Sequence, residues 1–182
     1  MREISLNILD VALNSVKAHA KSVLVKVIAE GNTVKTVIKD DGEGMDEKFL
    51  MRVSDPFTTT VSGKKVGMGL SLMKMAAELT GGSFHVSSEK GKGTVVEAEF
   101  IRGSVDRMPI GDLTSTMTSL IASAPNVDWR FYYRIDGREF DFELAEFKNY
   151  LNGIPIERAN VIACIGEYLS ENIKTVNGGV IL

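Results

Sequence analysis

Hydrophobic and polar positions follow two different spacings along the first hundred residues. Apolar side chains recur every three to four residues over 4–18 and again over 69–79, which predicts two amphipathic helices. Runs rich in valine and isoleucine at 22–28 and 33–39 flank a Glu-Gly-Asn turn and predict an antiparallel hairpin. The other elements expected in this part are a short helix and two strands, over 46–53, 83–87 and 94–100.

The character of the chain changes after residue 101. A linker over 103–111 precedes a predicted helix, and the Asp-Gly pair at 136–137 between aromatic-rich runs predicts a second hairpin. The elements expected here are a helix over 112–122, a strand over 127–135, a returning strand ending at 142, and helices over 143–151 and 157–174. We therefore expect an N-terminal domain, 1–102, and a smaller C-terminal α+β region of unknown role, 103–182. The aromatic residues of that region favour a small core over a binding platform.

Composition narrows the class of protein. The net charge of -3 and the absence of a basic run argue against nucleic acid as a partner. Cys164 is the only cysteine, so no intrachain disulfide can form, and a reducing, cytoplasmic setting fits best. No secretory signal pattern and no apolar run of roughly 18 residues is present, so we expect no membrane partner.

The chain places a carboxylate at the end of the predicted hairpin. Asp40 follows the second strand directly and begins the segment Asp40-Asp41-Gly42-Glu43-Gly44-Met45. A carboxylate held there can accept a hydrogen bond from an exocyclic amine such as that of adenine, and glycines allow a ligand to approach the backbone closely. The alternative is an ordinary acidic turn, because Asp and Gly are common turn residues.

A polar stripe on the first predicted helix offers ligands of a different kind. Asn7, Asp10, Asn14 and Lys17 fall on one side of that helix at spacings of three and four. Two carboxamides, a carboxylate and a lysine can together hold a hydrated Mg²⁺ and its phosphates, because this hard cation prefers oxygen ligands and keeps several waters. A solvated helix face is the alternative.

The segment between the short helix and the second long helix has the composition of a flap. Residues 58–66 contain three threonines, Gly63 and the pair Lys64-Lys65, which could bring cations near phosphate, although an ordinary surface loop would look the same. Gly67-Met68-Gly69-Leu70 then begins the next helix. A glycine-lined helix N-terminus offers free N–H groups and the positive end of a dipole, which suits phosphate.

Taken together in chain order, these segments resemble the GHKL ATPase/kinase superfamily, which includes DNA gyrase, the ninety-kilodalton heat-shock chaperones, sensor histidine kinases and MutL. The resemblance covers about residues 1–100. It also rests on Asp55-Pro56-Phe57 and on Gly91-x-Gly93-Thr94 before the last strand of this part. It implies an α/β (α+β) two-layer sandwich, in which helices cover one face of a mixed, mainly antiparallel sheet and ATP lies between the helices and a lid.

The resemblance also implies roles for individual residues. Asn14 looks like the Mg²⁺ ligand and Lys17 like a phosphate-contacting lysine. Asp40 matches the adenine-binding aspartate, in a pocket shaped by glycines. The remaining matches are the lid aromatic, the phosphate-contacting glycines and a residue that helps hold the base: Phe57, Gly67, Gly69 and Thr94.

Asp10, four residues before Asn14, stands where ATP-hydrolysing members and anti-sigma serine kinases have glutamate and many sensor histidine kinases have asparagine. As a general base it could orient water or a substrate hydroxyl. Neither His19 nor His85 resembles a phosphoacceptor histidine, so we expect phosphoryl transfer to another protein. A slow ATPase switch and a nucleotide sensor without turnover, each controlling a partner, remain alternatives, and association into a homodimer is left open.

Overall fold

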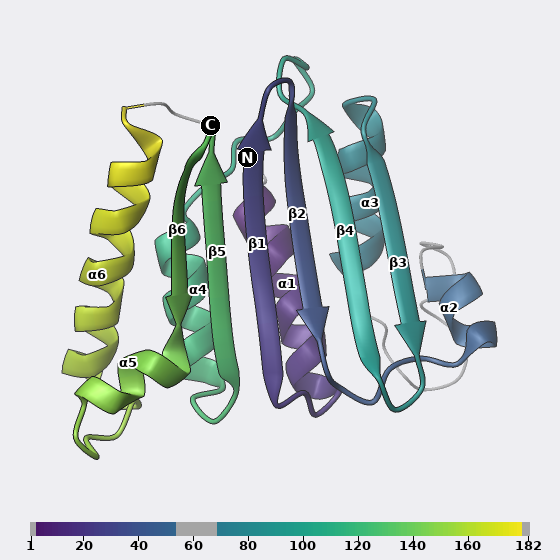
Figure 1. The fold of residues 1–182 in the computed structure, drawn as a ribbon. Coiled ribbons are helices and arrows are strands. Elements are labelled where there is room, and N and C mark those ends of the chain that lie inside the picture. The colour runs from purple at the N-terminus through teal and green to yellow at the C-terminus, as the bar shows by residue number, and fades with distance from the viewer. Residues whose placement is uncertain (1–2, 54–68, 180–182) are drawn as a thin grey trace.

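One six-stranded sheet with helices on one face forms the architecture of the protein (Figure 1). The structure is a computed structural model and describes residues 3–53 and 69–179. The strand order is β3-β4-β2-β1-β5-β6, and all neighbouring strands are antiparallel except β1 and β5. The expected two-layer sandwich on a mixed, mainly antiparallel sheet is therefore confirmed. The strands are β1 (Ser22–Glu30), β2 (Thr33–Asp40), β3 (Ser83–Glu89), β4 (Gly93–Ile101), β5 (Asp128–Ile135) and β6 (Arg138–Glu143).

The helices lie close to where the sequence predicts them. They are α1 (Ile4–Lys17), α2 (Glu47–Val53), α3 (Gly69–Leu79), α4 (Leu113–Ser123), α5 (Leu144–Tyr150) and α6 (Ala159–Asn177). In the view of Figure 1, α1, α3 and α4 lie behind the sheet, and α6 runs beside β6 at one edge. The helices α2 and α3 lie at the other end of the sheet from α6, where both contact β3.

The helix α1 is held at its start by backbone hydrogen bonds and is followed by a sharp change of chain direction. Its first N–H groups, those of Ile4 and Ser5, donate to the carbonyl oxygens of Pro109 and Ile110 at 3.0 and 2.8 Å. These bonds satisfy donors that a helix leaves unpaired at its N-terminus. At the other end His19 has a left-handed φ of 58° and turns the chain toward β1. Residues from beyond position 102 thus hold the start of the first helix.

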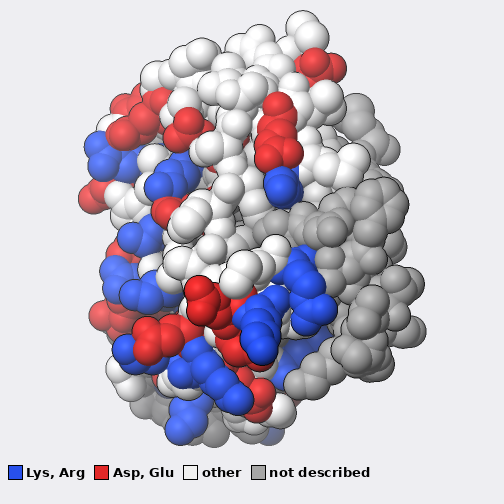
Figure 2. All heavy atoms as spheres, turned by 90° about the vertical axis from the view of Figure 1, so that its right-hand side faces the viewer, with Lys and Arg blue, Asp and Glu red and all other residues white. Residues whose placement is uncertain are grey.

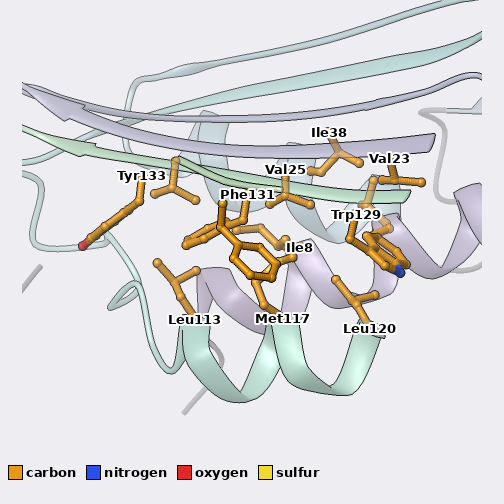
Figure 3. Packing of buried hydrophobic residues seen from close by; sticks show 14 of the residues in the cluster. Ile8, Val23, Val25, Ile38, Leu113, Met117, Leu120, Trp129, Phe131 and Tyr133 are labelled. Carbon is orange, nitrogen blue, oxygen red and sulfur yellow. The ribbon is translucent and has the colours of Figure 1, made fainter. Parts of the chain in front are cut away.

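The core is continuous from the N-terminal part of the chain into the C-terminal part. Figure 3 shows Ile8 of α1 and Met117 of α4 packed beneath Phe131 of β5. Trp129 is also buried, and its indole N–H donates to the carbonyl oxygen of Ala124 at 3.0 Å. Each such side chain contributes on the order of 1.5–3 kcal/mol by leaving water.

The C-terminal part of the chain extends the same sheet. The strand β5 runs parallel to β1 from the pair Ser22↔Asp128 to the pair Ala29↔Ile135, and β6 pairs antiparallel with β5. The two parts expected from the sequence, 1–102 and 103–182, therefore contribute strands to a single sheet. Most of the aromatic residues of the second part face the core as expected, whereas Tyr150 is exposed.

The face of the sheet opposite the helices carries charged side chains in pairs. Lys35 of β2 pairs with Glu97 of β4 at 2.7 Å, and Arg134 of β5 pairs with Glu30 of β1 at 2.7 Å. Figure 2 shows basic and acidic side chains interspersed on the side of the molecule that carries β3 and α2. None of the described helices is both long enough and apolar enough to cross a bilayer. The expectation of no nucleic-acid partner stays a prediction.

Candidate nucleotide-binding site

The carboxylate of Asp40 lies at the end of β2, where it is 8% exposed. It accepts three hydrogen bonds from three separate segments of the chain. The Ser15 hydroxyl of α1 donates to Oδ2 at 2.6 Å, and the backbone N–H of Gly42 donates to Oδ1 at 2.9 Å. The backbone N–H of Thr94, which is the register partner of Asp40 on β4, donates to Oδ1 at 3.2 Å.

These contacts leave the carboxylate with acceptor capacity. An ionised carboxylate offers about four lone-pair positions, two on each oxygen. In Asp40, Oδ1 receives two donors from the described residues, whereas Oδ2 receives only the Ser15 hydroxyl. With respect to residues 3–53 and 69–179, one acceptor position on Oδ2 is therefore left for a donor such as an exocyclic amine. Because the other three donors fix the orientation of the carboxylate, a ligand does not have to order it.

Gly42 lies where a side chain would not fit. A Cβ atom at this position would stand 2.7 Å from the carbonyl oxygen of Ala18 and 3.1 Å from Oδ1 of Asp40. The backbone of the turn thus packs directly against the end of α1. The glycine is required by the close approach of two chain segments, and the same closeness brings its N–H to Asp40.

Gly44 and Gly93 are required for a related reason. Gly44 has a φ of 63°, and a Cβ there would lie 2.0 Å from the carbonyl oxygen of Glu89. Gly93 has a φ of 101°, and its Cβ would lie 2.0 Å from the carbonyl oxygen of Asp40. Both glycines allow the segment after β2 to pack against the β3–β4 turn. The sequence predicted that these glycines lie near a ligand. The structure shows that both allow two backbone segments to pack closely against each other.

Ser88 joins the segments of this region and was not anticipated from the sequence. It accepts a hydrogen bond from the Met45 backbone N–H at 2.8 Å and donates to the Gly93 carbonyl oxygen at 2.9 Å. Its hydroxyl also lies 2.9 Å from Oγ1 of Thr94. A serine in a strand carries no distinctive pattern, so only the register of β3 on β4 reveals this role.

The predicted stripe on α1 divides into buried and accessible members. Asn7 is buried, so a wholly solvated face is excluded, whereas Asp10 and Lys17 are exposed and Asn14 is half-buried. Asp10 and Asn14 are four residues apart and therefore lie on one face of the helix. Accessible amide and carboxylate oxygens thus occur one turn apart.

The start of α3 packs against α1 beside Asp10. A Cβ atom at Gly69 would lie 2.9 Å from Cβ of Asp10, and Leu70 is buried directly after it. Ser15, which binds Asp40, is five residues further along α1, about 7.5 Å along the helix axis. The helix α1 therefore contacts the start of α3 near Asp10 and the Asp40 network at Ser15, and Asn14 lies between these two positions in the sequence.

Several predicted site residues lie outside the described residues: Phe57, Lys64, Lys65, Gly67 and Met68. The lid and the first phosphate-contacting glycine therefore stay predictions. Within residues 3–53 and 69–179 no group of three or more His, Cys, Asp or Glu residues is arranged to hold a metal ion. A cation at Asn14 would therefore need ligands from phosphate and water, which is the usual manner of Mg²⁺.

Helices cover one face of a mixed sheet, the Asp40 carboxylate is held at the end of β2, and α3 begins with a glycine beside α1. These features define an α/β protein with a candidate nucleotide pocket. Residues 1–103 match the model of the family described as histidine kinase-, DNA gyrase B-, and HSP90-like ATPase. The chain belongs to this family and contains a histidine kinase-like ATPase domain. Membership in it implies ATP binding.

Individual relatives are similar to the same part of the chain. Sporulation kinase A of Bacillus subtilis is 31% identical over 100 residues, which cover 55% of this chain and 16% of the relative. Sensor histidine kinase YvrG of the same organism is 32% identical over 93 residues, which cover 48% of this chain and 16% of the relative. The chain thus spans about a sixth of the length of these relatives.

A solved structure shares the fold over more of the chain. The crystal structure of the N-terminal domain of a DNA repair protein superposes with a TM-score of 0.53 and 13% identity. The superposition covers 78% of this chain and 52% of that one. At this identity the likeness concerns the fold alone.

Proposed function

We propose that the protein binds Mg·ATP and transfers the γ-phosphoryl group to a protein partner. The observation that carries the proposal is the Asp40 carboxylate, which three donors among the described residues hold in place. The remaining acceptor position on Oδ2 would take the adenine amine. The phosphates would extend along α1 toward Asp10 and the start of α3. The names of the similar proteins, which are sporulation and sensor kinases, support the kinase reading.

Residues of α1 would hold the metal and the phosphates in this arrangement. The amide oxygen of Asn14 would bind Mg²⁺, and Lys17 would contact phosphate. Bound Mg²⁺ would supply neutralisation of charge on the phosphate oxygens. The N-terminus of α3, which begins at Gly69, adds backbone N–H groups and the positive end of a helix dipole.

The acceptor is proposed to lie on the partner. The sequence has two histidines, and neither occurs within a described helix. His19 follows α1 and pairs with Glu43 at 2.8 Å, and His85 is exposed on the edge strand β3. In the proposed transfer a nucleophilic side chain of the partner attacks the γ-phosphorus and ADP leaves, and Asp10 receives the proton when the nucleophile is a hydroxyl. We place this reaction in the cytoplasm, in keeping with a lone cysteine that is exposed.

ATP hydrolysis is the second candidate, and the position of Asp10 favours it. Its carboxylate is exposed on α1 and lies beside the start of α3. A carboxylate so placed can orient a water molecule as a general base. Lid closure on ATP and opening after hydrolysis would then control the docking of a partner.

Incubation with γ-labelled ATP and Mg²⁺ separates the candidates. We expect label on a protein encoded beside this gene, and we expect the transfer to be lost in the Asp40→Asn variant. Release of inorganic phosphate without a labelled protein, abolished by Asp10→Asn, would select the ATPase switch instead. Stoichiometric ATP binding with neither product would contradict both enzymatic readings and leave a nucleotide sensor.

A further inference from the structure

A cavity lies beside β6. This strand is the edge of the sheet on the other side of the molecule from β3 and α2 (Figure 1). The cavity has a volume of about 300 Å³ and is bounded by β6, α5 and α6. Four aromatic side chains line it: Phe142, Phe147, Tyr150 and Tyr168. Three carboxylates line it as well: Asp141, Glu143 and Glu146. All seven residues lie beyond the part of the chain that matches the ATPase family.

Three of the rings form a continuous wall. The ring centroids of Phe142 and Phe147 are 6.0 Å apart, and the Tyr168 ring lies 6.2 Å from the first and 6.1 Å from the second. The fourth ring, that of Tyr150, belongs to a residue that is 82% exposed, and Tyr168 is 44% exposed. Two large aromatic side chains therefore remain in contact with solvent at a cavity where burial would be favourable.

The charges of the cavity are not balanced. Arg130 of β5 pairs with Asp141 at 2.5 Å and with Glu143 at 3.0 Å. Glu146 lies within ion-pair distance of no cation in the described part of the chain, although its charge, like those of Asp141 and Glu143, helps to raise the pKa of Arg130. Three carboxylates against one guanidinium leave two negative charges in excess, so an apolar occupant would desolvate carboxylates without compensation.

We propose that this cavity receives the guanidinium group of an arginine side chain on a partner protein. Aromatic faces attract a cation through their negative electron density. A guanidinium group is planar, weakly hydrated and able to stack on a ring while it donates two hydrogen bonds to one carboxylate, whereas an ammonium group is a compact, strongly hydrated charge. Glu146 is the acceptor for the incoming group, and the exposed ring of Tyr150 stacks on it. The site is separate from the proposed nucleotide pocket and does not depend on phosphoryl transfer.

The test uses a short arginine peptide, acetyl-Gly-Arg-Gly-amide, titrated into the full chain. We expect saturable shifts of the NMR signals of the Tyr150 and Tyr168 rings and no comparable shift with the same peptide containing citrulline, which is neutral. The variants Glu146→Gln and Tyr150→Ala alter exposed side chains and should each weaken binding about threefold to fivefold. Glu78→Gln on α3 removes a carboxylate far from the cavity and should leave the affinity unchanged.

Four results would overturn the proposal. The first is that the citrulline peptide shifts the signals of the same rings at the same concentration. The second is that the arginine peptide binds the Glu146→Gln variant as tightly as the unaltered protein. The third is that neither ring signal shifts when the arginine peptide is added. Equal binding of the matching lysine peptide would also contradict the selectivity for a guanidinium group. Thermal unfolding of each variant checks that the fold is retained.

Discussion

Ser15, Gly42 and Thr94 donate hydrogen bonds to the Asp40 carboxylate. In the proposed nucleotide complex, the adenine amine donates to the remaining acceptor position on Oδ2. Replacing Asp40 with Asn keeps the shape of the side chain but turns one acceptor oxygen into a donor nitrogen. Either a backbone donor or the adenine amine then faces an N–H group. We expect ATP affinity to fall by about 1–3 kcal/mol, measured by calorimetry.

The neighbouring carboxylate provides a matched control. Asp41 is exposed, and its Oδ1 accepts the backbone N–H groups of Lys21 and Ser22 at 2.8 and 2.9 Å. Asp41→Asn makes the same chemical change one residue further along and should leave ATP affinity within about 0.5 kcal/mol of the unaltered protein. Equal affinities of all three proteins would remove Asp40 from the pocket.

Gly44 and Gly91 make a second matched pair at the scale of single residues. Both have positive φ, 63° and 81°, so alanine is strained at either position. Only Gly44 is also crowded, because its Cβ would lie 2.0 Å from the Glu89 carbonyl oxygen, whereas nothing lies within 4 Å of a Cβ at Gly91. In urea unfolding we expect Gly91→Ala to cost about 1 kcal/mol and Gly44→Ala at least about 2 kcal/mol more. Equal losses of stability would contradict the contact between the two turns.

At the scale of the elements, the helix α4 begins at an N-cap residue that can titrate, Asp112. The Asp112 carboxylate accepts the Ser115 backbone N–H at 2.8 Å and the Ser115 hydroxyl at 2.6 Å. These hydrogen bonds hold the pKa of Asp112 below its ordinary value, and they outweigh the opposing effect of partial burial. Asp112→Ala should destabilise the protein by about 1 kcal/mol at pH 7 in urea unfolding.

The pH dependence of that cost follows from the direction of the shift. A carboxylate whose pKa is lower in the folded state contributes stability above its unfolded pKa of about 3.9, and this contribution is lost as the pH falls through the folded pKa. The difference between the Asp112→Ala variant and the unaltered protein should therefore shrink in strongly acidic solution. A difference that grows on acidification would show that the cap is not the ionised carboxylate.

The helix α1 shows what periodicity could and could not predict. Its spacing correctly indicated an amphipathic helix. The buried face is rotated relative to the face on which the apolar residues gather, because Asn7 and Ser15 are buried while Leu9 and Leu13 are only partly covered. The rotation arises because α1 packs against α4 and the linker as well as against the sheet. The Thr116 hydroxyl of α4, for example, donates to the Ser5 carbonyl oxygen at 3.3 Å. Partners that are distant in sequence leave no local pattern.

The same limit applied to the site. The position of Asp40 at a strand end and the glycines after it could be read directly, because turn residues and strand composition are local signals. Ser15 and Ser88 could not, because the role of Ser15 depends on how α1 packs against the end of β2, and that of Ser88 on the pairing of β3 with β4. The parallel pairing of β1 with β5 joins segments about a hundred residues apart, and no hydrophobic pattern specifies it.

At the scale of the whole molecule, the C-terminal part supports the ATPase part. Deleting residues 103–182 would unpair one side of β1 over its contact with β5, and would uncover core residues that α4 and β5 now shield, including Ile8 and Val25. It would also remove the carbonyl groups that hold the start of α1. We expect the 1–102 fragment to give a poorly dispersed NMR spectrum and no cooperative urea transition.

A fragment that unfolded cooperatively at the midpoint of the full chain would contradict this dependence. Such a result would mean that the 1–102 part is an independent folding unit. The shared core would then contribute less to the stability of the N-terminal part than its burial indicates.

A structure of the protein with Mg²⁺ and a non-hydrolysable ATP analogue tests the central claim most directly. The account predicts the adenine amine within hydrogen-bond distance of Oδ2 of Asp40, the metal at the amide oxygen of Asn14, and the phosphates beside Asp10 and the start of α3. An analogue bound elsewhere on the molecule, with Oδ2 of Asp40 contacted only by Ser15, would contradict it.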